Sequence, residues 1–136
     1  MSSTDNVFEW DLAKFTTKVS SMDREHEGLV KIMNQLFKEN NSGADKNQLL
    51  KTVTLLATKT TEHFANEEKY FTALPNYDGA KTHKLIHQKL LSQFGEHLEK
   101  FKASPKGKFD DEFFRFLKVW LQAHICGVDR KYGEVS

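Results

Sequence analysis

The sequence predicts an all-α protein, an antiparallel up-down-up-down four-helix bundle with an N-terminal arm. Apolar residues recur at spacings of three and four in four successive segments, as they do along one face of an α-helix. Short connections containing Asn, Gly, Ser and Pro separate these segments. No alternating run bounded by turn residues indicates a strand. With 136 residues, 2 Pro, 7 Gly and 11 Phe, we expect a single domain over residues 1–136 with a core rich in Phe.

The elements follow in order along the chain. Residues 1–19 are interpreted as an arm, because their apolar side chains are irregularly spaced, and residues 20–132 as the bundle. The four helices are predicted to begin near residues 20, 45, 80 and 110 and to end at residues 40–43, near 73, before 104 and by 132. Phe109 and Phe114 occupy the positions of a hydrophobic staple around the start of the fourth helix.

Composition excludes several classes of function. The formal net charge is +1, from 20 basic and 19 acidic residues, so we expect no nucleic-acid or anionic-membrane partner. Cys126 is the single cysteine, which excludes an internal disulfide and fits a reducing compartment. We expect no signal peptide, since a basic and then apolar start is lacking. No apolar run approaches the ~18–20 residues that span a bilayer, so a cytoplasmic location is predicted.

His63 and Glu67 are the first pair to suggest chemistry. At about 100° per residue they lie one turn apart on the same face of the second helix. That face is otherwise apolar, with Leu56 and Phe71 on either side of the pair. Buried polar groups are costly unless they are satisfied, and a simple hydrogen bond to a neighbouring acid would satisfy one such pair. A metal site therefore requires that other helices bring ligands to the same place.

The order and direction of the helices bring further candidate ligands to the same place as His63 and Glu67. Five of the 6 histidines fall on inward stripes. Each lies near the start of an odd helix or the end of an even helix, and these ends share one pole of an antiparallel bundle. The histidines in question are His26, His63, His83, His87 and His124. Glu67 and Asp129 add carboxylates at the same pole, so the sequence predicts a metal site there.

The ligand set indicates which metal. His83 and His87 can chelate one ion from one helix face, and Glu67 can bridge two ions. His124 and Asp129 are five residues apart, so the helix must loosen after His124, which Gly127 permits. Seven candidate ligands are too many for one four-coordinate zinc, and imidazole with carboxylate but no thiolate suits iron. Cys126 is interpreted as packing and not as a ligand.

With these residues in place, the sequence resembles the hemerythrin family, particularly the single-domain bacteriohemerythrin type. The resemblance covers nearly the whole chain. Its segments are Asp23-Arg-Glu-His26-Glu-Gly-Leu29, His63-Phe-Ala-Asn-Glu67-Glu68, His83-Lys-Leu-Ile-His87 and Trp120-Leu-Gln-Ala-His124-Ile-Cys-Gly-Val-Asp129-Arg-Lys-Tyr132.

The resemblance implies a non-haem di-iron centre. By this resemblance, one iron would have its coordination filled by three imidazoles, those of His83, His87 and His124. The other iron would be held by His26 and His63, which would leave one of its positions open. Glu67 and Asp129 would bridge the irons, together with an oxo or hydroxo group. Dioxygen would bind at the open position.

Residues beside the ligands have expected roles of their own. An apolar wall that slows the entry of protons is predicted at Leu29, Phe64, Trp120, Leu121 and Ile125, which also serve as bundle core. Asp23, one turn before His26, is either the acceptor for the second N–H of that ring or an acid favoured by the helix dipole. Glu68 is expected to face solvent or the arm. His97 is expected to be structural or exposed.

Three functions share this ligand set. The leading hypothesis is a reversible dioxygen binder for carriage, storage or delivery, and not an enzyme; an oxygen-consuming protein would be the partner in local delivery. The second is a di-iron enzyme that consumes peroxide or nitric oxide, or that repairs iron sites. The third is an oxygen sensor that acts through a partner. The lifetime of the oxygenated form separates a carrier from an enzyme.

Overall fold

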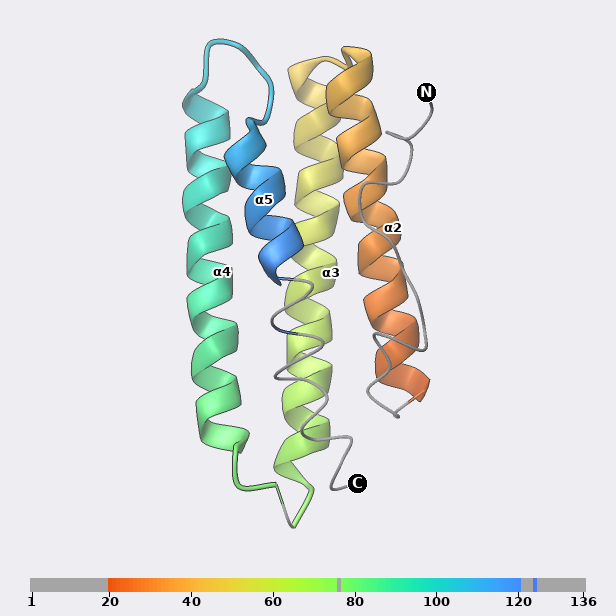
Figure 1. The fold of residues 1–136 in the computed structure, drawn as a ribbon, viewed down its shortest axis with the longest axis vertical. Helices are drawn as coiled ribbons and strands as arrows, with labels where there is room; N and C mark the ends of the chain where they lie inside the picture. The colour runs from red at the N-terminus through yellow and green to blue at the C-terminus, as the bar shows by residue number, and fades with distance from the viewer. Residues whose placement is uncertain (1–19, 76, 121–123, 125–136) are drawn as a thin grey trace.

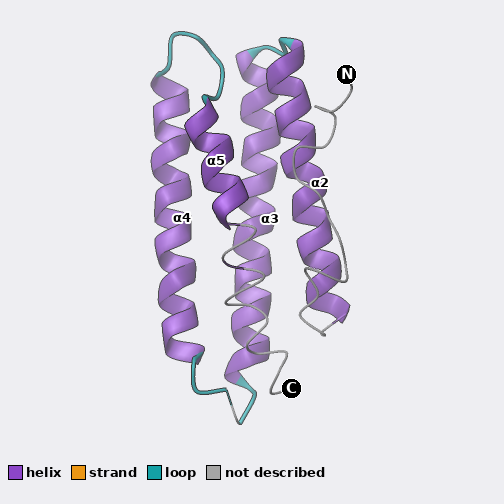
Figure 2. Cartoon of the chain, viewed as in Figure 1, coloured by secondary structure: helices purple, strands orange, loops and turns teal. Residues whose placement is uncertain are grey.

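The computed structural model describes residues 20–75, 77–120 and 124. These residues form four helices, α2 (Ser20–Ser42), α3 (Lys46–Thr72), α4 (Ala80–Ala103) and α5 (Asp111–Val119). Consecutive helices run antiparallel, in an up-down-up-down bundle (Figure 1). The described residues include no strand (Figure 2). The predicted fold class is confirmed, whereas the arm at residues 1–19 lies outside the described residues and stays a prediction.

Local sequence signals account for the helix boundaries. Asp45 caps α3, because its carboxylate accepts a hydrogen bond from the backbone N–H of Gln48 at 2.9 Å. Asp110 caps α5 in the same way, through the N–H of Phe113 at 3.0 Å. Gly43 follows α2 with φ of 86°, a left-handed conformation that favours glycine. The predicted starts near 45 and 110 coincide with these two caps.

One end of the bundle is filled with Phe rings. Phe101 stacks on Phe109 with ring centroids 4.0 Å apart, and Phe109 stacks on Phe113 at 4.4 Å. Phe114 meets Phe109 edge to face at 6.3 Å, and both are buried, which confirms the predicted staple. The buried amide of Asn40 in α2 donates to the carbonyl of Phe109 and accepts from its N–H, so it fixes the connection between α4 and α5. This end of the core is therefore apolar and well ordered by packing.

The opposite end is where the start of α2, the end of α3 and the start of α4 come together, and α5 runs toward it (Figure 1). We call this end the metal pole. A small second core cluster, built on Met22 and Phe71, lies there. Among the described residues, no helix is long and apolar enough to cross a membrane.

Candidate metal centre

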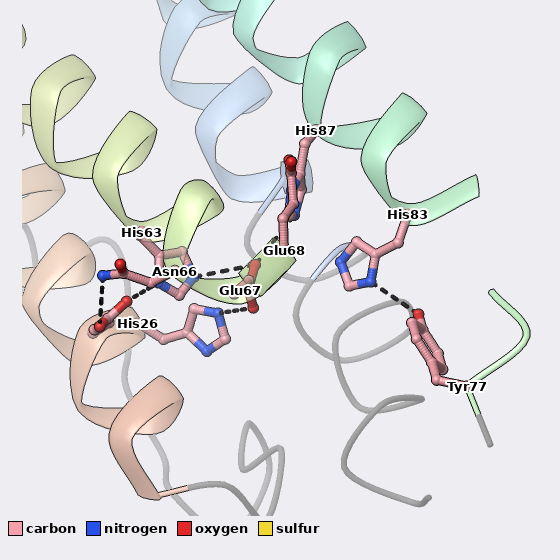
Figure 3. Close-up of polar contacts among 9 residues, drawn as sticks. His26, His63, Asn66, Glu67, Glu68, Tyr77, His83 and His87 are labelled. Atoms are coloured by element: carbon pink, nitrogen blue, oxygen red, sulfur yellow. Dashed lines mark hydrogen bonds and ion pairs between the residues drawn. The ribbon is translucent and has the colours of Figure 1, made fainter. Parts of the chain in front are cut away.

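Six of the seven predicted ligands lie together at the metal pole. Each is at most 3% exposed, and they are His26, His63, Glu67, His83, His87 and His124. Figure 3 shows those on α2, α3 and α4, namely His26, His63, Glu67, His83 and His87. The stripes predicted from periodicity point inward as expected, because α2, α3 and α4 each turn their histidines toward the shared core. The seventh predicted ligand, Asp129, lies outside the described residues.

The ligand atoms form two groups that meet at one carboxylate. Atoms of Glu67, His83, His87 and His124 lie within 4.8 Å of one another, and so do atoms of His26, His63 and Glu67. Oε2 of Glu67 is 3.3 Å from Nε2 of His26. Oε1 of Glu67 is 3.4 Å from Nε2 of His63 and 3.1 Å from Nε2 of His87. The carboxylate of Glu67 thus lies between the two groups and contacts imidazoles of both, as a ligand shared by two ions would.

Electrostatics favour a cation between these groups. Burial raises the pKa of Glu67, but attraction to His63 and polar contacts with His26, His63 and His87 outweigh burial and hold that pKa well below its usual value. Burial lowers the pKa of His63, but Glu67 and Glu25 outweigh it and the net pKa is raised. The carboxylate of Glu67 therefore stays ionised, and positive charge beside it, at His63, is stabilised. A metal ion supplies that charge without protonating the rings.

Two buried imidazole nitrogens lack a hydrogen bond, which also fits a metal site. Nε2 of His63 and Nε2 of His87 have no hydrogen-bond partner within the part of the chain that the structure describes. Each instead faces Glu67 Oε1 in the ion-pair contacts given above. A buried imidazole nitrogen left without a hydrogen bond is costly, and a metal ion offsets that cost by accepting its lone pair. The residues present fit a metal site.

The opposite nitrogen of each of three rings is held by a side chain from elsewhere. Nδ1 of His63 is 2.6 Å from Oε1 of Glu25, and Nδ1 of His87 is 3.0 Å from Oε2 of Glu68. Nδ1 of His83 is 2.9 Å from the hydroxyl of Tyr77 (Figure 3). A carboxylate can only accept, so Nδ1 of His63 and of His87 carries the proton. Their Nε2 lone pairs then point at the centre, which is the usual arrangement around a metal.

These partners include one wrong expectation and two residues that were missed. Glu68 was expected to face solvent or the arm, but its carboxylate binds His87. The side chain of Glu68 lies about 100° around α3 from that of Glu67, but it is long enough to reach His87 on the neighbouring helix α4 while staying 32% exposed. Glu25 and Tyr77 were not predicted. Glu25 directly precedes a candidate ligand, which is a weak signal, whereas Tyr77 lies in the α3–α4 connection and has no periodicity to reveal it.

Asp23 is buried in the first turn of α2, one turn before His26. Its expected role as acceptor for the His26 ring stays a prediction.

Aromatic rings line the candidate ligands. Phe64 stacks on His87 with centroids 3.8 Å apart and planes within 2°, and Trp120 lies parallel to His124 within 11° at 6.2 Å. Phe71, which was not assigned to the wall, stacks on His83 at 4.4 Å. Leu29, Phe64 and Trp120 are buried as the predicted wall requires. Leu121 and Ile125, its other predicted members, lie outside the described residues.

Only Trp120 and His124 are described after α5. Trp120 and His124 have π-helical hydrogen bonding, a conformation that often occurs at functional sites. The loosening predicted to follow His124 falls on residues that are not described. His97 lies away from the pole and packs against Phe113 and Phe116 at 5.5 and 4.9 Å, in keeping with a structural role.

Comparisons with known proteins agree with this geometry. The family model of the Hemerythrin HHE cation binding domain matches residues 17–135. A hemerythrin chain from Sipunculus nudus is 32% identical over 125 residues, which cover 92% of this chain and 90% of that protein. Bacteriohemerythrin of Methylococcus capsulatus is 28% identical over 127 residues, covering 93% and 95%.

A crystal structure of wild-type hemerythrin superposes with a TM-score of 0.85 at 27% identity, covering 95% of this chain and 97% of that one. The family match spans nearly the whole sequence, and the solved structure has the same fold over the same length. The chain therefore belongs to the hemerythrin family.

Proposed function

We propose that this protein binds dioxygen reversibly at a non-haem di-iron centre, for oxygen carriage, storage or delivery. The observation that carries the proposal is the position of Glu67, whose carboxylate lies between two groups of buried imidazoles and belongs to both. One ion would not need both groups. Two ions that share a carboxylate would use all of them.

The proposed ligands are His26, His63, Glu67, His83, His87, His124 and Asp129. Imidazole and carboxylate donors without thiolate suit iron among the available ions. A bound pair of ferrous ions would supply the two electrons that reversible dioxygen binding requires. A centre with mostly neutral ligands should favour the ferrous state, which supports binding over oxidation chemistry.

Residues around the proposed ligands would orient the imidazoles and exclude water from the centre. Glu25, Glu68 and Tyr77 hold the outer nitrogens of three imidazoles and so aim the inner nitrogens at the centre. Phe64, Phe71 and Trp120 cover the rings on their flat faces and keep water away from them. A dry site slows the proton transfer that would end reversible binding, because protons need water or polar groups to travel.

The test combines metal analysis with spectroscopy. Protein expressed with sufficient iron is expected to contain two irons per chain. Its absorption band should form in air, disappear under argon and return in air. Glu67→Gln should lose iron, whereas Glu62→Gln, an exposed change on the same helix, should retain it. One zinc and no iron would reject the centre. Steady consumption of an added reductant by the oxygenated protein would favour an enzyme instead of a carrier.

A further inference from the structure

A small cavity lies inside the bundle between the metal pole and the Phe-rich end. Its volume of about 10 Å³ is enough for one molecule of the size of water. Residues from all four described helices contribute to its lining, beginning with Met33 of α2. Apart from the hydroxyl of Thr60 and the indole N–H of Trp120, the lining side chains carry no oxygen or nitrogen. The cavity belongs to neither group of candidate metal ligands.

Its inner wall is the aromatic layer that covers the candidate ligands. Phe64 and Trp120 line the cavity, and they are also the rings that stack on His87 and His124. Their centroids are 6.1 Å apart, so they stand next to each other in this wall. The cavity and the metal pole are thus separated by the thickness of one aromatic ring.

Its outer end approaches the surface between α4 and α5. Leu90 and Leu91 of α4 and Phe116 of α5 line it, and all three are only partly buried. The contact between His97 and Phe116 shows that the two helices are direct neighbours here. Because these three side chains are partly exposed, they are where a gas molecule would enter the cavity from solvent.

The polarity of the lining decides which molecule fits. Thr60 is 4% exposed, and its hydroxyl has no hydrogen-bond partner within the described part of the chain. A buried water needs two to four polar partners, and the lining side chains carry the Thr60 hydroxyl and the indole N–H of Trp120 as their polar groups, the bottom of that range. Apolar cavities stay dry and accept xenon. The site therefore suits a small apolar gas better than water.

We propose that this cavity is a docking site for one small apolar gas molecule, where dioxygen pauses between the surface and the metal pole. The identity of the natural occupant rests on the proposed function, but the affinity of the cavity for an apolar gas does not. A station on the route changes the rates of entry and exit by the same factor, since both directions pass through it. It leaves the equilibrium affinity at the metal unchanged.

Xenon binding tests the cavity without relying on oxygen chemistry. We expect saturable binding of xenon, measured by xenon NMR, to the full chain both with and without iron. Leu91→Phe should abolish it by filling the cavity, and Leu90→Phe is a second filling variant should the first fail to fold. Leu85→Phe makes the same substitution at an exposed position of α4 and should not affect xenon binding. Thr60→Val keeps the shape, removes the hydroxyl and should also bind xenon.

The oxygen route is tested by stopped-flow kinetics on the iron-loaded protein. The filling variants should slow association and dissociation by the same factor, with the oxygenated spectrum and the equilibrium affinity unchanged. The gas site is overturned if the unmodified protein binds no xenon, if binding survives both filling variants, or if only Thr60→Val binds xenon, which would mean that a water occupies the cavity. The route is overturned if filling abolishes xenon binding and leaves both oxygen rates unchanged. Failure of the unmodified protein to bind oxygen would reject the proposed function and leave the xenon result standing.

Discussion

Nδ1 of His63 and Oε1 of Glu25 lie 2.6 Å apart, in a hydrogen bond that links a buried imidazole to a carboxylate open to solvent. This hydrogen bond is the largest cause of the lowered pKa of Glu25, and partial burial opposes it. Asn66 donates to the other oxygen of Glu25 at 3.2 Å and holds the carboxylate in place. An imidazole that donates to a carboxylate is a more basic ligand, so Glu25 should strengthen metal binding by His63.

Glu25→Gln is expected to loosen the metal without unfolding the bundle. Glutamine keeps an oxygen that can accept from Nδ1 but removes the negative charge. Loss of such a partner typically weakens a metal site by about 10- to 100-fold, and the lower part of this range applies to this conservative change. The measurement is the rate of iron transfer to a chelator. Glu62→Gln is the matched control, since Glu62 is exposed and pairs only with Lys59 among the described residues. Equal rates for both variants would show that Glu25 does not support the centre.

Tyr77→Phe is expected to affect His83 alone. The ring of Tyr77 would still pack against Phe71 at 5.5 Å, but the hydroxyl that contacts Nδ1 of His83 would be gone. Gly79 leaves room for this ring, because a Cβ at that position would lie 3.3 Å from Cζ of Tyr77. We therefore expect faster iron loss with little change in thermal stability of the iron-free protein. A drop in stability without any change in iron retention would mean that the hydroxyl serves the fold only.

His83→Ala and His87→Ala are each expected to lose iron and to unfold at a lower temperature than the iron-loaded parent. Both side chains are about 1% exposed at the metal pole, and a metal that binds only the native state adds to its stability. His97→Ala is the control on the same helix, since His97 lies away from the metal pole and its ring contacts Phe113 and Phe116. Metal content and melting temperature are the readouts. Iron loss from His97→Ala as fast as from His83→Ala would contradict the arrangement at the pole.

Much of this architecture could be predicted because its causes are local or topological. Asp45 and Asp110 are capping residues that mark helix starts within a few positions of sequence. The common pole follows from short connections, since they force consecutive helices to run antiparallel. His26 and His87 are 61 residues apart in sequence, yet both contact Glu67. Periodicity and direction were sufficient to place them together.

Contacts that depend on side-chain reach could not be predicted in this way. Glu68 lies off the buried stripe of α3, and only the separation of α3 and α4 determines that its carboxylate meets His87. Tyr77 depends on the path of a connection that carries no periodic pattern. The cavity beside Thr60 depends on the fit of nine side chains from four helices, which no single helix pattern contains.

The last prediction concerns the cap of α5, because this helix leads to Trp120 and His124. The pKa of Asp110 is lowered, first by the N–H of Phe113 and then, against slight burial, by Lys100. A lowered folded-state pKa means that the cap stabilises the protein fully above the ordinary aspartate pKa of about 3.9 and loses this effect as the pH falls through the folded-state value. Asp110→Ala should therefore cost about 1 kcal/mol of unfolding free energy near neutral pH, and less in acid.

Asp110→Asn is the matched control, since asparagine caps helices nearly as well and does not titrate. It should retain most of the parent's stability at neutral pH. Its difference from Asp110→Ala should stay constant with pH, whereas the difference between the parent and Asp110→Ala should shrink as the solution is acidified. Denaturant unfolding of all three proteins at each pH gives these differences. The metal pole is the same in all three proteins, so its contribution to the pH dependence cancels and the comparison isolates residue 110. A cost of Asp110→Ala that persists unchanged in acid would show that the side chain acts by packing and not through its charged carboxylate.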